Sequence, residues 1–138
     1  MARALYSRMA IDFGTSNTVV AFWDEEKGGF FDRSRDAAPL GGLDVRRKPL
    51  QDSPTPGANS IAAIVLGRLH GYTGNALYSE RALWTLETFA GVVPQFGLFA
   101  ASFGLAALLS ARHPMQIVVT GSAGDPIARE PEIGALDA

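Results

Sequence analysis

The hydrophobic positions of this chain change their period along its length. Up to about residue 32 they form short runs, AIDF, TVVAFW and FF, separated by turn-forming residues, as is typical of strands. From residue 59 to about 111 they recur every three or four positions, the spacing of one helix face. Residues 33–58 between them are charged, rich in proline and glycine and without period, which predicts a long loop. The pattern therefore predicts a mainly α chain with a small β part, an α+β fold.

The first 32 residues predict a short helix followed by strands. MARALYSRM has the pattern of an amphipathic helical stretch. AIDFGTSNTVVAFWD then predicts two strands around a turn at residues 14–17, because threonine, valine and aromatic residues favour strands. Gly28 and Gly29 predict a second turn, after which Phe30 and Phe31 return as strand, so we expect a hairpin or a three-stranded meander. The inward positions of the helical stretch would be Ala4, Leu5, Met9 and Phe13.

Three helices and a late strand are predicted for residues 59–121. Prolines before residue 57 exclude a helix there, Asn59 and Ser60 are favoured N-cap types, and Gly71 and Gly74 are stop signals. The helices should cover residues 59–72, 76–91 and 96–111, the first two as an antiparallel hairpin, with a strand at 115–120 and a loose tail over 122–138. Their inward positions would be Ile61, Ile64, Val65 and Leu69; Leu83, Leu86, Phe89 and Ala90; and Phe96, Phe99, Phe103 and Ala106 or Ala107.

Composition narrows the classes of partner and site. The chain is 47% hydrophobic and 19% charged with a net charge of -2, so it lacks the basic surplus expected for nucleic acid or an anionic membrane. The absence of cysteine excludes disulfides and thiolate metal sites, and His70 and His113 lack metal-ligand spacing, so no metal is predicted. The start of the chain has no apolar signal core, and the apolar run 92–109 is interrupted, which predicts a buried helix and a cytoplasmic protein.

The stretch AIDFGTSNTVVAF has a pattern suited to phosphate binding. A glycine-led turn between strands directs backbone N–H groups into one concavity, and hydroxyl groups add donors. It resembles the first phosphate-binding hairpin of the Hsp70–actin–sugar kinase ATPase superfamily. That resemblance implies Mg-ATP as cofactor, with Asp12 orienting metal-bound water and with phosphate contacts from Gly14, Thr15, Ser16 and Asn17. An ordinary hairpin turn has the same pattern, and no second Asp-Gly hairpin follows.

A second resemblance extends from Phe22 to about Gly121. FWDEEKGGFFD, VRRKPLQDSPTPGANSIAAIVLGRLHGYTG, LETFAGVVPQF and MQIVVTG resemble the C-terminal region of thioredoxin-domain proteins related to spermatogenesis-associated protein 20. The resemblance implies a thioredoxin-like domain followed by an (α/α)6 barrel similar to six-hairpin glycosidases. It also implies that loop 45–57 overlies the barrel mouth and that Asn59 and Ser60 begin an inner helix. On this interpretation the chain is a fragment that has no cofactor and is inactive alone.

Three functional hypotheses therefore stand beside one another. The first is the barrel fragment, which would bind a carbohydrate-related small molecule. The second is the truncated ATPase-like nucleotide binder. The third is an interaction module that self-associates through exposed apolar helix faces. No catalytic residue is assigned, and aromatic side chains next to a polar loop suit sugar-like ligands. The candidate ligand-binding residues are Trp23, Arg46, Lys48, Asp52, Asn59 and Ser60.

Overall fold

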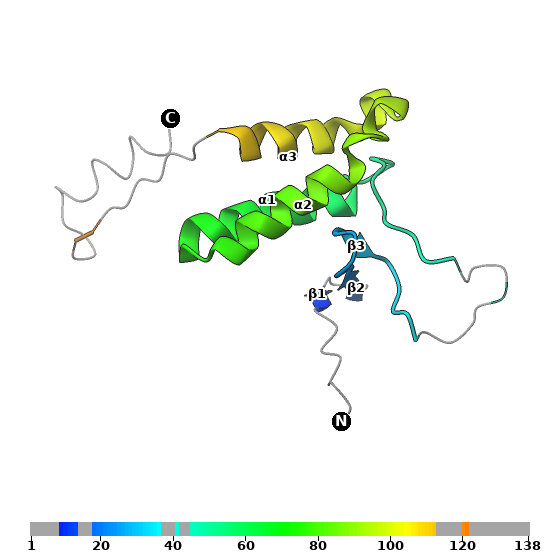
Figure 1. The fold of residues 1–138 in the computed structure, drawn as a ribbon, viewed down its shortest axis with the longest axis horizontal. Coiled ribbons are helices and arrows are strands. Elements are labelled where there is room, and N and C mark those ends of the chain that lie inside the picture. The colour runs from blue at the N-terminus through cyan, green and yellow to red at the C-terminus, as the bar shows by residue number, and fades with distance from the viewer. Residues whose placement is uncertain (1–8, 14–17, 37–40, 42–44, 113–119, 122–138) are drawn as a thin grey trace.

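The computed structural model describes residues 9–13, 18–36, 41, 45–112 and 120–121. A small sheet precedes a helical part, and the predicted α+β class is confirmed (Figure 1). The predicted segment boundaries are not tested and stay a prediction. The strand expected at 115–120 and the tail at 122–138 lie outside the described residues, except for Thr120. The elements are β1 Met9–Phe13, β2 Thr18–Trp23, β3 Phe30–Phe31, α1 Ala58–Thr73, α2 Ala76–Ala90, the 3₁₀ turns η2 Val93–Gln95 and η3 Gly97–Ala100, and α3 Ala101–Ala111.

The sheet is an antiparallel meander in the order β1-β2-β3, which confirms the expected strand arrangement. Met9 pairs with Phe22 at one end of the hairpin and Phe13 pairs with Thr18 at the other. The short β3 continues the sheet through the pairing of Trp23 with Phe30. The helical stretch predicted over MARALYSRM is wrong at Met9, which belongs to the β1 ladder, and residues 1–8 lie outside the described chain. Phe13 lies in the strand predicted for AIDF and does not continue a helix.

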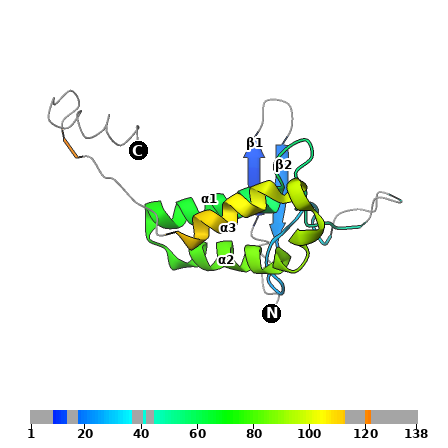
Figure 2. The ribbon, with the colours of Figure 1, turned by 90° about the horizontal axis from the view of Figure 1, so that it is seen from above.

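The helices α1 and α2 form the predicted hairpin, and α3 lies across them (Figure 2). Gly74 ends α1 in the left-handed conformation, with φ 67°, and its N–H donates to the carbonyl of His70 over 2.8 Å. Asn75 then caps α2, because its side chain accepts from the N–H of Leu77 over 3.0 Å. Gly71, predicted as a stop, lies inside α1, because only Gly74 adopts the backbone geometry that ends the helix.

The buried face of α1 is small and polar, contrary to the prediction. Ile61, Val65 and Leu69 were expected inward, but their side chains are 40%, 46% and 36% exposed. The buried positions are instead Asn59, Ser60, Ala63 and Leu66, on the other side of the helix. Small residues such as Ala63 allow α1 to approach its neighbours closely. Of the four α1 positions predicted to face inward, Ile64 packs partly against the core. The apolar spacing thus marked a real helix face that this chain leaves uncovered.

The other two helices confirm part of the predicted core. Leu86 and Phe89 are buried as expected, whereas Leu83 is 46% exposed and Ala90 is exposed too. Phe99 was also expected inward but is 56% exposed, because residues 97–100 form a 3₁₀ turn that changes the direction of its side chain. The main core cluster comprises Leu50, Ala63, Leu86, Phe89, Ala100, Phe103 and Ala106, with Ile64, Val93, Phe96 and Ala107 packed against it.

Candidate functional site

The turn between β2 and β3 packs closely on α2. Asp24 organises the turn, because its Oδ1 accepts from the backbone N–H groups of Glu26 and Lys27 at 3.0 and 3.3 Å. Gly28 has φ 72°, and a Cβ there would lie 2.7 Å from Cδ1 of Trp84. Only glycine therefore allows the turn to take this conformation against the helix. The hydroxyl of Thr88 on α2 also donates to the carbonyl of Lys27 over 2.5 Å.

Lys48 connects the loop before α1 to the same turn. Its Nζ lies 2.7 Å from Oδ2 of Asp24, and both side chains are largely buried, at 13% and 11% exposed. The ammonium also donates to the carbonyl of Gly28 over 2.5 Å. Partial burial acts to raise the pKa of Asp24, but the hydrogen bonds from Lys48 and from two turn N–H groups outweigh it, and the pKa is lowered. The pair therefore stays ionised and fixes the loop on the turn.

Aromatic side chains carry the remaining contacts of this region. The guanidinium of Arg46 lies 3.7 Å from the centre of the Phe31 ring, a cation–π arrangement, and its Nε donates to the carbonyl of Arg33 over 2.9 Å. Trp23 is 7% exposed and meets the rings of Phe30 and Trp84 edge-on, at centroid distances of 5.1 and 5.7 Å. The Trp23 ring is thus enclosed by protein groups.

Asn59 joins three segments through one buried amide. The residue is 1% exposed, and its Oδ1 accepts from the N–H of Phe30 over 2.6 Å. Its Nδ2 donates to the carbonyls of Phe30 and Pro49 at 3.0 and 2.8 Å. The side chain does not cap α1, whose N-cap is Gly57, so the predicted capping role is wrong. Ser60 beside it is fully buried, and its Oγ has no hydrogen-bond partner among the described residues.

Asp52 caps α3 from a distant part of the chain. Its Oδ2 accepts from the N–H of Ser102 over 2.8 Å, and its Oδ1 from the Ser102 hydroxyl over 2.5 Å. The same Oδ1 accepts from the N–H of Gly57 over 2.6 Å, directly before α1. The Ser102 hydroxyl and N–H lower the pKa of Asp52, with partial burial opposing them and the N–H groups of Gly57 and Ala101 adding to the decrease. A carboxylate at a helix N-terminus satisfies free N–H groups and favours the helix dipole.

The six candidate residues thus divide into two groups. Trp23, Arg46, Lys48 and Asn59 meet around the segment from β2 to β3, whereas Asp52 lies at the start of α3. Ser60 belongs to the buried side of α1. The polar groups of Lys48, Asp52 and Asn59 are engaged with protein atoms, which gives them a clear structural role. For the second hypothesis, the backbone of Asp12 pairs with Val19 in the hairpin, and residues 14–17 lie outside the described chain.

A groove that the sequence did not indicate lies at the other end of the helices. Its volume is about 450 Å³, and it is lined by Ala63, Ile64, Gly67, Arg68, His70, Gly71 and Tyr72 of α1, Ser79, Ala82 and Leu83 of α2, and Leu109, Ser110 and Arg112 at the end of α3. None of the predicted site residues lines it. The signal available in the sequence was the pair Gly67 and Gly71, two glycines one turn apart inside a predicted helix.

The described residues contain no group of three or more His, Asp or Glu side chains suited to a metal ion. His70 uses its Nδ1 for a 3.0 Å contact with the carbonyl of Asn75, which helps to close the α1–α2 turn. Within the described parts of the chain, every helix is too short or too polar to cross a membrane.

Comparison with curated proteins supports one of the two resemblances. The chain is similar to spermatogenesis-associated protein 20. The rat protein of that name is 33% identical over 110 residues, which cover 79% of this chain and 13% of the relative. The human and mouse proteins are 41% and 39% identical over 70 residues, which cover 50% of this chain and 8% of each relative. No family model and no solved structure matches the chain.

The matched part is a small share of each relative. Because the chain spans only 8% to 13% of the length of the spermatogenesis-associated protein 20 sequences it matches, most of their residues have no counterpart here. None of these three matches assigns a role to any residue. The geometry of the helices, and above all their uncovered apolar faces, is therefore the basis on which a function is proposed.

Proposed function

We propose that this chain is a wall segment of a larger helical protein of the spermatogenesis-associated protein 20 kind, in which neighbouring helices cover its outer faces. The observation that carries the proposal is an outer apolar stripe on α1, formed by Ile61, Val65, Leu69 and Tyr72. Their side chains are 40%, 46%, 36% and 78% exposed. With about 100° of rotation per residue, the four positions fall within an arc of about 80°.

The stripe lies opposite the face that α1 already buries. The buried residues Asn59, Ala63 and Leu66 lie about 60–180° around the helix from the members of the outer stripe. A helix that buries one face within its own chain and exposes an apolar stripe on the other needs a second neighbour to remove that stripe from water. This supports the interpretation that α1 has a helix layer on each side in the complete protein.

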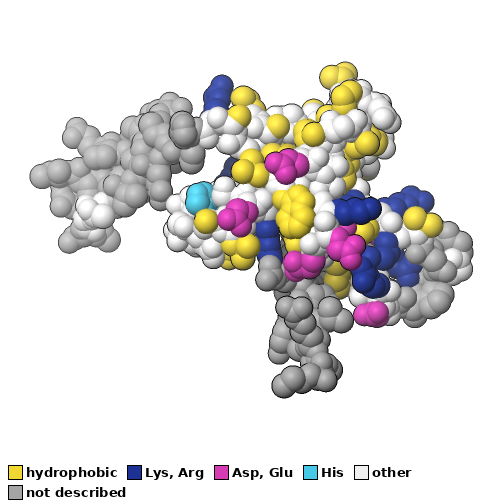
Figure 3. Space-filling model, viewed as in Figure 1, with side chains coloured by type: hydrophobic (Ala, Val, Ile, Leu, Met, Phe, Trp, Pro, Cys, Tyr) yellow, Lys and Arg dark blue, Asp and Glu magenta, His cyan; other side chains and the backbone are white. Residues whose placement is uncertain are grey.

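The end of the chain's helical part repeats the arrangement. Leu105, Leu108 and Leu109 of α3 are 50%, 48% and 45% exposed, while Phe103 and Ala106 on its other side are buried. Leu98 in η3 is 91% exposed, and apolar surface is visible along this upper part of the molecule in Figure 3. Exposed apolar side chains on neighbouring elements are the kind of surface that contacts with other protein parts cover.

The finer form of the proposal is that the larger body is an (α/α)6 barrel preceded by a thioredoxin-like domain. In such a barrel α1 and α2 would form one of the helical hairpins, and the chain would be inactive alone. Loop 45–57 would then serve as a rigid border of the barrel mouth, which is supported by the way Lys48, Asp52 and Asn59 hold it against the helices. A carbohydrate-related ligand would be shared with helices that other parts of the protein supply.

Complementation between two pieces tests this proposal. The chain is co-expressed with rat spermatogenesis-associated protein 20 from which the matching 110 residues have been deleted, and co-elution is measured by size-exclusion chromatography. We expect the parent chain to form a stoichiometric complex with the deleted relative. The affinity of the Val65→Glu variant should be at least tenfold lower, because a charge replaces an apolar contact worth about 1.5–3 kcal/mol. Leu77→Glu on α2, at a similarly exposed position, is the control.

Two outcomes would contradict the proposal. The first is a chain that remains a monomer in light scattering and has no affinity for the deleted relative. The second is a chain that forms a stable dimer through the outer apolar stripe and leaves the deleted relative unbound, which would favour the self-association hypothesis instead.

A further inference from the structure

The groove between the far ends of the three helices has the dimensions of a small-molecule site. In Figure 1 α3 diverges from the α1–α2 hairpin toward its C-terminal end. The residues that line the groove come from α1, α2 and the end of α3. Its volume of about 450 Å³ falls within the range of ligand pockets in proteins. The groove is separate from the region around Asp24 and Lys48, and its lining shares no residue with that region.

The wall of the groove that α1 forms contains two glycines, which carry no side chain. Gly67 and Gly71 lie one turn apart on α1 and both line the groove. A Cβ built on either would meet no atom within 4 Å, so the packing of this chain does not require glycine at these positions. Glycine inside a helix costs stability relative to alanine. Their presence leaves room for an occupant that approaches the backbone of α1.

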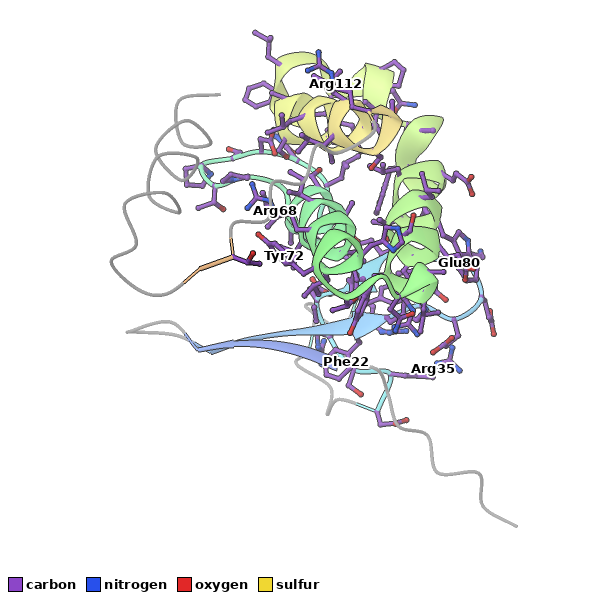
Figure 4. The ribbon with its side chains drawn as sticks, turned by 90° about the vertical axis from the view of Figure 1, so that its left-hand side faces the viewer. Phe22, Arg35, Arg68, Tyr72, Glu80 and Arg112 are labelled. Carbon is purple, nitrogen blue, oxygen red and sulfur yellow. The ribbon has the colours of Figure 1, made fainter. Side chains whose placement is uncertain are left out.

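The remaining lining is apolar on the inside and positive at the edge. Ile64, Leu83 and Leu109 supply apolar surface from three different helices, and no lining residue is acidic. Arg68 and Tyr72 project from the same side of α1, with Arg112 on α3 above them (Figure 4). Among the described residues neither arginine forms an ion pair, and Glu80 projects from the opposite side of the helical hairpin in Figure 4.

We propose that the groove binds an amphipathic carboxylate, with a compact apolar body over Gly67 and Gly71 and the carboxylate at Arg68. A guanidinium presents parallel N–H donors that match a carboxylate in a bidentate arrangement. The apolar body contacts Ile64, Leu83 and Leu109, which removes exposed leucine surface from water. The groove is formed by residues of this chain, and it shares Tyr72 and Leu109 with the exposed faces described above, so its occupancy is tested on the chain alone.

Binding of octanoate to the full chain tests the site, with octan-1-ol and octylammonium as neutral and positive counterparts. Affinity is measured by calorimetry, and the amide signals of Gly67 and Gly71 are followed by NMR. We expect saturable octanoate binding that shifts both amide signals. Octylammonium should bind at least about tenfold more weakly than octanoate, because a charge-assisted hydrogen bond is lost.

Two variants with matched controls separate the apolar and the charged contributions. Gly71→Leu places a side chain in the groove without a clash and should abolish octanoate binding. Gly104→Leu is the control, because Gly104 is an exposed helix glycine with equal space around it but lies outside the groove, and this variant should bind octanoate normally. Arg68→Gln should weaken octanoate binding about tenfold, while Arg35→Gln, the same charge change outside the groove, leaves it unchanged. Arg68 is exposed, so its variant folds and decides the matter if Gly71→Leu does not.

Three results would overturn the proposal. One is octylammonium binding as tightly as octanoate, which would show non-specific apolar association. Another is unchanged binding by both Gly71→Leu and Arg68→Gln. The last is octanoate affinity that falls as chain concentration rises, which would show that a second copy of the chain occupies the groove.

Discussion

Replacing Asp52 by asparagine should destabilise the whole helical part, because one carboxylate joins the starts of two helices. Its oxygens accept from the Ser102 N–H and hydroxyl and from the Gly57 N–H, over 2.5 to 2.8 Å. Asparagine keeps a similar shape but has one acceptor oxygen, so it cannot satisfy both helix starts. Loss of a helix cap costs about 1 kcal/mol, and loss of one further hydrogen bond costs about as much. The expected decrease in the free energy of unfolding at pH 7 is therefore about 2 kcal/mol.

The pH dependence of the same variant gives a sharper test. Because the pKa of Asp52 is lowered in the folded chain, the folded state holds this proton less firmly than the unfolded state. The stabilisation is then fully present above the ordinary carboxyl pKa of about 4 and is lost as the pH falls through the lower, folded value. The difference between parent and Asp52→Asn should accordingly shrink below about pH 4 and vanish at more acidic pH.

Urea unfolding followed by circular dichroism at pH 7 and at pH 3 measures both effects. Glu87→Gln, the same loss of charge at an exposed position of α2, is the matched control and should change stability by less than about 0.5 kcal/mol. The reasoning would be refuted if Asp52→Asn unfolds at the same urea concentration as the parent at pH 7. A difference that persists unchanged at the lowest pH would equally show that the charge of Asp52 is not its source.

Three further predictions concern other parts of the chain. Gly67→Ala should raise the free energy of unfolding by about 0.5–1 kcal/mol, and with it the thermal midpoint, because its Cβ enters open space. Gly57→Ala should lower the midpoint, because a Cβ there lies 1.9 Å from a backbone oxygen. Asn59→Ala should cost about 2–4 kcal/mol in urea unfolding, with faster amide exchange at Phe30; unchanged exchange would contradict the bridging role. If the hairpin binds nucleotide, Mg-ATP should titrate the parent and bind Asp12→Ala at least tenfold more weakly; absent or equal binding removes that hypothesis.

Features whose cause lies within a few residues followed from the sequence. Gly74 ends α1 as the predicted stop signal, through a hydrogen bond to the carbonyl four positions before it. The cap at Asn75 is equally local, although it was not predicted. The meander was likewise predictable, since Gly28 and Gly29 supply the positive φ angles that the turn between β2 and β3 needs. Residues 97–100 were predicted as part of a continuous helix but form a 3₁₀ turn, in which Phe99 is exposed. The local sequence pattern did not distinguish these two kinds of helix.

The roles of the candidate site residues could not be derived in this way. Asp52 and Ser102 are 50 residues apart, Asn59 and Phe30 are 29 apart, and Thr88 and Lys27 are 61 apart. Each of these side chains had several possible partners in the sequence, and only the packing of the helices selects one. Polar residue types were therefore recognised correctly as notable, but their bonds to the protein itself were not foreseen.

By itself the sequence predicted a small antiparallel sheet followed by helices, and it placed large apolar residues along one face of α1. Only the tertiary structure decided that α1 buries its opposite face, with Asn59 and Ala63, and leaves Ile61 and Val65 uncovered. The physical reason is that backbone preferences act over a few residues, whereas burial depends on which neighbours are present to cover a surface. The uncovered stripe and the groove beside Gly67 and Gly71 follow from that packing.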